Sequence, residues 1–117
     1  METFARWVLA LQSLPIAISG SRALFTPDAA TAVGEPLAGV PRTALHIIGL
    51  TSLTLGATHL VLATRGSHSA VKLALGAMIP IKLLAAVYLG IDGMSGVALW
   101  EALSGIVYAT ILVVQRY

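Results

Sequence analysis

Residues 76–90, GAMIPIKLLAAVYLG, decide how the rest of the chain is interpreted. With the flanking AVKLAL before them they form Ala70–Gly90, a run of 21 residues or roughly 31 Å of helix. That length matches the roughly 30 Å hydrocarbon core of a bilayer. Lys82 lies inside this run, where inserting a charge costs about 2.5 to 3.5 kcal/mol. A neighbouring group that offsets this cost is therefore expected.

The composition of the whole chain is that of a membrane protein. Of its 117 residues, 57% are hydrophobic and only 10% are charged, whereas about 25% charged residues are usual in soluble domains. The length predicts a single transmembrane domain over residues 1–117. The chain has no Cys, which excludes disulfides and thiol chemistry. The few basic residues are scattered among apolar runs, so the expected partner is the lipid bilayer and not nucleic acid.

Four apolar runs predict four transmembrane helices, and short polar turns separate the last three of them. Consecutive helices joined by short turns pack side by side in opposite directions. The predicted fold is therefore all-α, a four-transmembrane-helix antiparallel bundle. The predicted spans are about residues 4–25, 43–63, 70–90 and 96–114.

The first connection, residues 26–42, is longer than the others. Thr26 followed by Pro27 is a helix start signal, and it predicts a short interfacial helix of about two turns. The glycines and prolines after it predict an extended segment. In the preceding span, Ser13, Ala17 and Ser21 form a stripe of small residues that favours close contact with another helix.

The charged residues in the connections and near the ends of the apolar runs predict the orientation. The basic residues on the side of the N-terminus are Arg6, Arg65, Lys72 and Arg116. The opposite side carries the acids Asp28, Glu35 and Asp92, together with Arg42. By the positive-inside rule both termini are cytoplasmic. The membrane would be the endoplasmic reticulum in a fungus or the plasma membrane in a bacterium.

Candidate site residues follow from their depth in the predicted helices. Lys82 lies about 12 Å and Glu101 about 8 Å below the non-cytoplasmic ends of their helices, within side-chain reach of each other. Ser104 and Tyr108 share the helix face of Glu101. Arg22 and His46 lie near the same side of the membrane. We expect these four ionisable residues, Arg22, His46, Lys82 and Glu101, to line one polar pocket, with a loop acid above it.

Each member of this pocket has a structural alternative. Lys82 and Glu101 could simply be an ion pair that locks two helices, and Arg22 could reach up to lipid headgroups. His46 could be an ordinary surface residue, and Trp100 fits an aromatic belt at the interface. His59 lies apart from the cluster and is expected to hydrogen-bond to another helix. The spacing of the histidines and acids predicts no metal site, and no motif for a cofactor is present.

A stretch of the first connection resembles a known family. The pattern G-x-R-x-L-x-x-P-D-A-A at Gly20–Ala30, the Gly-x-Pro at Gly34–Pro36 and the spacing of the four spans are similar to a family of roughly 120-residue, four-helix membrane proteins of unknown function, found in bacteria and fungi. Some fungal relatives resemble enzymes that open epoxides or cyclise polyketides or terpenoids. The resemblance implies that Arg22 and Asp28 are the best-matched polar positions.

The leading interpretation is thus a membrane-embedded enzyme of secondary metabolism, working without a cofactor on a lipophilic small molecule. It would open an epoxide, as a hydrolase does, or cyclise a polyketide or terpenoid. Asp28 would be the base, a protonated Glu101 the acid, and Arg22 and Lys82 the groups that stabilise charge. Residues expected to contact the substrate are His46, Asp92 and Trp100.

Two other classes stay open. One is a homodimeric small multidrug-type transporter, although such exporters carry an acid inside the first span, and this chain has none between Glu2 and Phe25. The other is a non-catalytic scaffold subunit in which the charges only fix helix pairing. A homo-oligomer is compatible with each interpretation.

Overall fold

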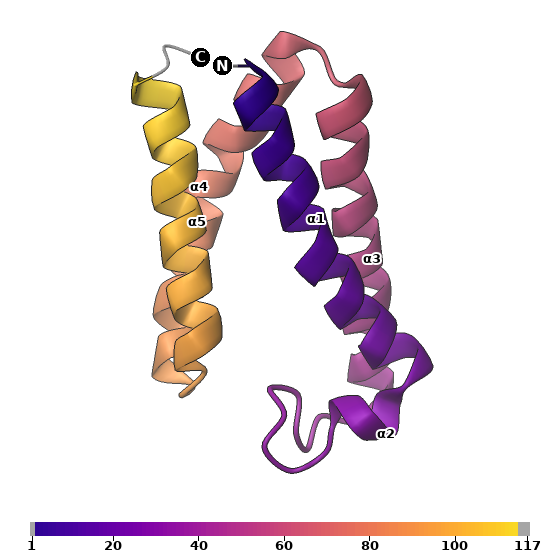
Figure 1. Cartoon of the computed structure of the whole chain (residues 1–117). Helices are drawn as coiled ribbons and strands as arrows, with labels where there is room; N and C mark the ends of the chain where they lie inside the picture. Colours follow the sequence, from indigo (N-terminus) through magenta and orange to yellow (C-terminus); the bar gives the residue numbers. More distant parts are fainter. Residues whose placement is uncertain (1, 115–117) are drawn as a thin grey trace. The chain divides into compact units, whose positions relative to one another are not determined.

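The computed structural model describes residues 2–114, and this part of the chain is folded into five α-helices without a strand (Figure 1). The helices are α1 (Glu2–Phe25), α2 (Pro27–Ala30), α3 (Arg42–Arg65), α4 (His68–Ile91) and α5 (Ser95–Val114). Each long helix begins and ends within two residues of the bounds predicted for its span. The all-α class with four long helices and a short one in the first connection is therefore confirmed. Arg116, used above to predict the orientation, lies outside the described residues.

The four long helices are long and apolar enough to cross a membrane. Their outer faces carry large apolar side chains that are more than half exposed, such as Leu73, Ile81 and Val87 on α4. In water so much exposed apolar surface would drive association, whereas in a bilayer it contacts lipid chains. The chain is an integral membrane protein.

The chain divides into two compact units. One is Trp7–Arg65, which holds most of α1 together with α2 and α3. The other combines the first residues of α1, through Arg6, with the chain from Gly66 onwards, which holds α4 and α5. A hydrogen bond of 2.7 Å from Arg6 Nη2 to the carbonyl oxygen of Gly66 joins the two segments of this second unit.

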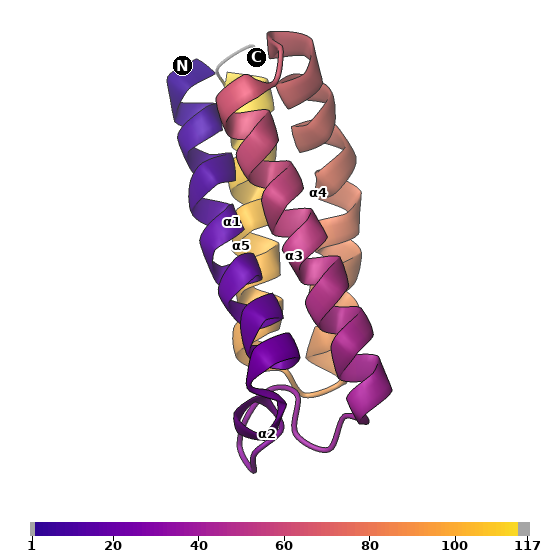
Figure 2. The same cartoon turned by 90° about the vertical axis from the view of Figure 1, so that its right-hand side faces the viewer.

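In the unit Trp7–Arg65, α1 and α3 run alongside each other in opposite directions (Figure 2). The contact depends on glycine, because a Cβ atom at Gly20 would lie 2.9 Å from the Cβ of Ser52 and 3.0 Å from the carbonyl oxygen of Gly49. Further along, Gly56 packs against Ser13 and Ala17. Small residues bring two backbones together and increase their dispersion attraction, which is the main force between helices in lipid.

The predicted stripe of small residues was therefore right at Ser13 and Ala17, but Gly20 makes the tightest contact where Ser21 was expected. Two helical turns advance about seven residues and not eight. A stripe that stays on one helix face thus moves from position 13 to position 20. Ser21 lies one residue beyond that face.

The connection between α1 and α3 differs from its prediction in two ways. Helix α2 has four residues, about one turn, instead of two. Thr26 precedes it as expected, but its hydroxyl donates to the carbonyl oxygen of Arg22 (3.1 Å) and does not cap α2. The residues after α2 form successive turns and not an extended segment, because Gly34 and Gly39 adopt positive φ angles of 89° and 77°.

In the second unit, α4 and α5 form a helical hairpin whose connection is only residues 92–94. Ser67 begins α4 by accepting a hydrogen bond from the backbone N–H of Ala70 (3.1 Å). Gly93 ends the helix with a φ of 83°, and the N–H of Met94 donates to the carbonyl oxygen of Leu89 at 2.8 Å. This Schellman arrangement reverses the chain within one turn. It thereby sets the two helices side by side, with Lys82 and Glu101 on facing sides.

Candidate functional site

The centre of the candidate site is an ion pair between α4 and α5. Lys82 Nζ lies 3.2 Å from Glu101 Oε2, and the side chains are 8% and 23% exposed. The pairing predicted from helix depth is therefore confirmed. Each group offsets the cost of burying the other, because an unpaired charge inside a span lacks both water and a counter-charge.

Packing around the pair keeps the lysine side chain in place. Gly105 on α5 faces the stem of Lys82, and a Cβ atom there would lie 3.5 Å from the Cβ of Lys82, which is ordinary contact. The apolar stem thus lies against the α5 backbone while the amine reaches Glu101 one turn earlier. Ser104, between them in sequence, is buried and donates its hydroxyl to the carbonyl oxygen of Trp100 (2.5 Å). Its hydroxyl proton is therefore used within α5.

Tyr108 completes this cluster. Its side chain is fully buried, and Lys82 Nζ lies 5.3 Å from the centroid of its ring. A cation at this distance from an aromatic face is attracted by the negative charge density of the ring. Lys82 thus contacts a carboxylate on one side and an aromatic ring on another. We call Lys82, Glu101 and Tyr108 the α4–α5 cluster.

Tyr108 was missed as a site residue, although the sequence placed it on the face of Glu101. Its hydroxyl is buried and has no hydrogen-bond partner among the described residues, 2–114. Gln12 Oε1 on α1 is buried and unpartnered within the same range. The available signal was the spacing of Glu101 and Tyr108, seven residues or two turns apart on one face.

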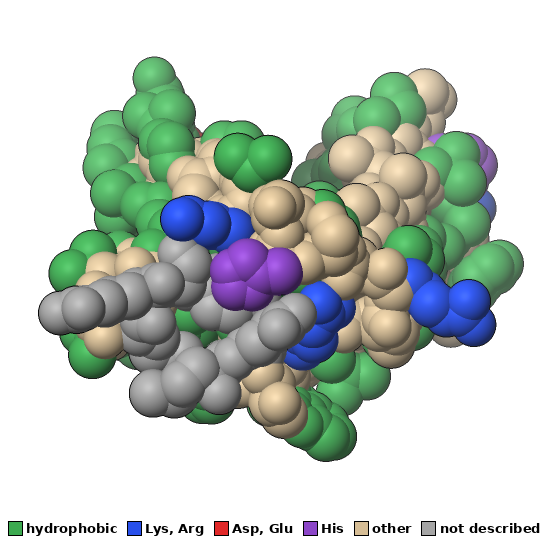
Figure 3. Space-filling view, turned by 90° about the horizontal axis from the view of Figure 1, so that it is seen from above, with side chains coloured by type: hydrophobic (Ala, Val, Ile, Leu, Met, Phe, Trp, Pro, Cys, Tyr) green, Lys and Arg blue, Asp and Glu red, His purple; other side chains and the backbone are tan. Residues whose placement is uncertain are grey.

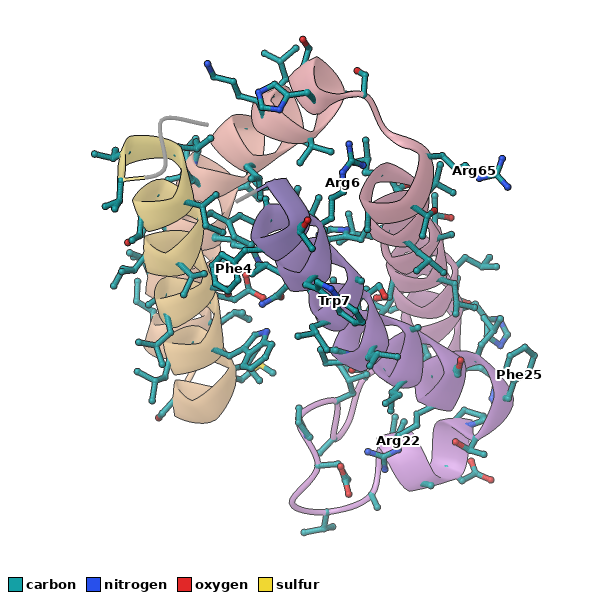
Figure 4. The ribbon with its side chains drawn as sticks, turned by 45° about the horizontal axis from the view of Figure 1, so that its top comes forward. Phe4, Arg6, Trp7, Arg22, Phe25 and Arg65 are labelled. Atoms are coloured by element: carbon teal, nitrogen blue, oxygen red, sulfur yellow. The ribbon has the colours of Figure 1, made fainter. Side chains whose placement is uncertain are left out.

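Arg22 and Asp28, the residues matched by the resemblance, lie in a second cluster in the unit Trp7–Arg65. Arg22 Nη1 lies 3.3 Å from Glu35 Oε2, and its Nη2 lies 3.5 Å from the carbonyl oxygen of Ala29. Asp28 pairs with Arg42 at 3.3 Å and is almost fully exposed. Figure 4 shows Arg22 extending from the end of α1 toward the segment after α2. These two ion pairs connect the loop to the ends of α1 and α3.

A small hollow of about 40 Å³ lies beside Arg22. Its walls are Ser19, Arg22, Ala30, Glu35, Pro36 and Leu37. This volume is enough for a water molecule or two but not for a terpenoid or polyketide. A role of Arg22 toward a larger substrate at this hollow therefore needs the loop to move and the ion pair with Glu35 to open.

The remaining predicted substrate contacts are His46, Asp92 and Trp100, and all three are exposed. His46 lies in the first half of α3, and Asp92 is the C-cap residue directly after α4. Arg22 and His46 belong to one unit, and Lys82 and Glu101 to the other. The pocket that would join all four stays a prediction.

His59 was expected to bond to another helix. It is buried on α3, and its Nδ1 lies 2.8 Å from the carbonyl oxygen of Leu55, one turn earlier in the same helix. Because a carbonyl only accepts, Nδ1 carries the proton in this contact. No group of three or more potential metal ligands lies together within the described residues.

A shallow groove of about 390 Å³ runs along α3. It is lined by Leu50, Thr51, Thr54, Leu55 and Thr58. Thr54 and Thr58 donate their hydroxyls to carbonyl oxygens four residues earlier, at 2.9 and 2.8 Å. None of these lining residues is charged, so the groove itself offers no ionisable group for acid–base chemistry.

Comparison with protein-family models, with curated proteins and with solved structures finds no match to this chain. The fold, the apolar outer faces and the buried ion pair define an integral membrane protein with an ionisable cluster inside its spans.

Proposed function

We propose that this protein is a membrane-embedded enzyme that uses acid–base catalysis on a lipophilic small molecule. One observation carries the proposal: Lys82 and Glu101 form a 3.2 Å ion pair within the spans, with Tyr108 beneath the amine. A buried pair is costly to maintain for stability alone, since apolar residues of similar volume often serve as well or better. Ionisable residues within spans mark functional sites in many membrane proteins.

The chemistry of the pair suits a reaction in which negative charge develops on oxygen. Lys82 supplies a fixed positive charge, and Glu101 can exchange a proton with the substrate when it is bound. In an epoxide opening or a cyclisation, the ring or carbonyl oxygen gains charge as its bond breaks or polarises. We assign Lys82 as the stabilising cation and Glu101 as the acid. For this role the Glu101 carboxylate has to take up a proton as the substrate oxygen replaces it beside the Lys82 amine.

We further assign Asp28 as the base and Arg22 as a second stabilising cation, following the resemblance at Gly20–Ala30. Arg suits only an electrostatic role, because it does not release its proton readily. Asp28 would have to exchange Arg42 for the substrate or a water molecule, which its exposure allows. The substrate class proposed on the same ground is a polyketide or terpenoid of secondary metabolism.

The proposed orientation places both termini in the cytoplasm. In the unit Trp7–Arg65, α3 ends in Arg65. At the opposite end of this unit, Arg22 and Arg42 are each paired with an acid, Glu35 and Asp28. In the other unit, α4 has Lys72 near its start and Asp92 at its end. Figure 3 looks onto the end with the α3–α4 turn, where the visible charged side chains of described residues are basic or histidine. This asymmetry supports the positive-inside arrangement.

The direct test is turnover of a lipophilic epoxide. Protein in lipid nanodiscs would be incubated with limonene oxide, and the diol or rearranged products followed by mass spectrometry. Glu101→Gln, Lys82→Gln and Asp28→Asn are each expected to reduce turnover by about 100-fold or more. Lys72→Gln is the matched control, because it makes the same change at an exposed lysine of the same helix.

The principal rival is a structural role for the pair, which the direct Lys82–Glu101 contact also favours. If the ion pair has only a structural role, the double variant Lys82→Met with Glu101→Leu should keep both folding and activity. A catalytic pair predicts that this double variant folds but is inactive. Near wild-type turnover in folded Glu101→Gln and Lys82→Gln would exclude the catalytic assignment.

A further inference from the structure

The hydroxyl of Tyr108 is the buried polar group that the proposed reaction leaves unused. The residue is fully buried, and within residues 2–114 its oxygen has no hydrogen-bond partner. Two other hydroxyls of α5 donate hydrogen bonds to backbone carbonyl oxygens of the same helix, Ser104 to Trp100 and Thr110 to Ile106. Tyrosine cannot do so, because a rigid ring holds its hydroxyl away from its own backbone. The group therefore needs an acceptor from elsewhere.

The surroundings of this hydroxyl restrict what the acceptor can be. Lys82 Nζ stands over the ring at 5.3 Å from its centroid and contacts Glu101 at 3.2 Å. A negatively charged ligand would compete with the Glu101 carboxylate for the single Lys82 amine and would leave a net negative charge inside the spans, which is costly. A pure hydrocarbon would leave the hydroxyl unpaired, which is unfavourable in a dry interior. A neutral acceptor oxygen on an apolar skeleton meets both conditions.

We infer that Tyr108 donates a hydrogen bond to the oxygen of a lipophilic ligand bound beside Lys82 and Glu101. The ligand class is an apolar molecule with a carbonyl, ether or epoxide oxygen and no negative charge. This inference rests on the proposed function for its site, since it adds a donor to the same cluster. Tyr108 fixes the position of the ligand oxygen near the Lys82 amine, which stabilises the charge that develops there.

The test uses geranylacetone, a terpenoid ketone, isotopically labelled at its carbonyl carbon so that its infrared band can be distinguished from those of the protein. With wild-type protein in nanodiscs we expect a carbonyl band shifted to lower frequency, as a hydrogen bond from a phenol produces. Tyr108→Phe should lose this shifted band and bind the ketone about five- to tenfold more weakly. The matched control is Tyr88→Phe, which removes the same atom from an exposed tyrosine on α4 and should behave as wild type.

Thermal unfolding provides the check on folding. Because the Tyr108 oxygen has no partner among the described residues, its removal should leave the unfolding temperature unchanged or raise it. A marked fall would show that the hydroxyl has a structural partner and would overturn the inference. So would an unshifted band in wild type, or a shifted band that persists in Tyr108→Phe.

These outcomes are distinguishable from those for the proposed function. If Glu101→Gln loses epoxide turnover but no infrared band depends on Tyr108, the proposed enzyme activity stands. The proposed hydrogen bond from Tyr108 to the ligand oxygen is then excluded. If the shifted band depends on Tyr108 but Glu101→Gln keeps full turnover, the proposed site for the ligand oxygen stands. The proposed catalytic role of Lys82 and Glu101 is then excluded.

Discussion

At the scale of single residues, Lys82 and Glu101 are coupled through burial. Lys82→Met leaves Glu101 without its counter-charge inside a span, and we expect this to lower the free energy of unfolding by about 3 to 5 kcal/mol. Adding Glu101→Leu removes the orphaned charge, so the double variant should regain most of the loss. Denaturant unfolding in detergent of the wild type, both single variants and the double variant measures the coupling. Additive losses would mean that the two side chains do not depend on each other.

Part of this residue-scale detail could be predicted from the sequence. Counting 1.5 Å per residue from the helix ends brought Lys82 and Glu101 to similar depths, and they pair. The partners of Arg22 and Asp28 could not be found this way. Glu35 and Arg42 reach them through a chain of turns whose path depends on positive φ angles at Gly34 and Gly39, which leave no periodic signal.

The sequence could not show that the hydroxyl of Tyr108 lacks a hydrogen-bond partner among residues 2–114, for a different reason. Periodicity shows which residues share a helix face, and it placed Tyr108 beside Glu101. Whether a polar atom finds a partner depends on the direction of its side chain and on every neighbouring group. That information exists only in three dimensions.

At the scale of helices, the α1–α3 contact depends on the absence of a side chain at Gly20. We expect Gly20→Ala to destabilise the protein by about 1 to 3 kcal/mol, because its methyl group would lie 2.9 Å from the Cβ of Ser52 and force the helices apart. Gly105→Ala is the matched control, since its new methyl group meets Lys82 at an ordinary 3.5 Å. Reversible unfolding of both variants in the same detergent measures the difference.

Gly105→Ala should be neutral or slightly stabilising, because alanine has the higher helix propensity. Equal losses for the two variants would show that helix backbone effects, and not the close α1–α3 approach, decide the cost at Gly20.

Helix positions were the most predictable part of the fold. Long apolar runs set the four spans to within two residues, because the bilayer requires a nearly fixed length of apolar helix. The short helix α2 was overestimated, because the start signal at Thr26 and Pro27 says nothing about where a helix ends. Prediction was thus good where the membrane imposes the structure and weak in the connection outside it.

At the scale of the whole molecule, the unequal distribution of charge predicts a single orientation. The chain has no native Cys, so single cysteines can be introduced without a background. Ser67→Cys should react with an impermeant maleimide only from the cytoplasmic side, and Asp92→Cys only from the opposite side. Glu35→Cys should behave like Asp92→Cys. Labelling of each position from both sides would indicate dual insertion, and labelling of position 35 from the cytoplasm would reverse the topology.

The three-residue connection between α4 and α5 also bears on how the chain enters the membrane during synthesis. When the ribosome has synthesised the chain through α4 but not yet α5, the translocon holds a helix whose Lys82 has no counter-charge. Glu101 follows 19 residues later, and the tight turn at Gly93 folds it back to the lysine within the same hairpin. The favourable pathway is therefore one in which α4 waits at the channel until α5 has emerged, and the two helices move into the lipid together.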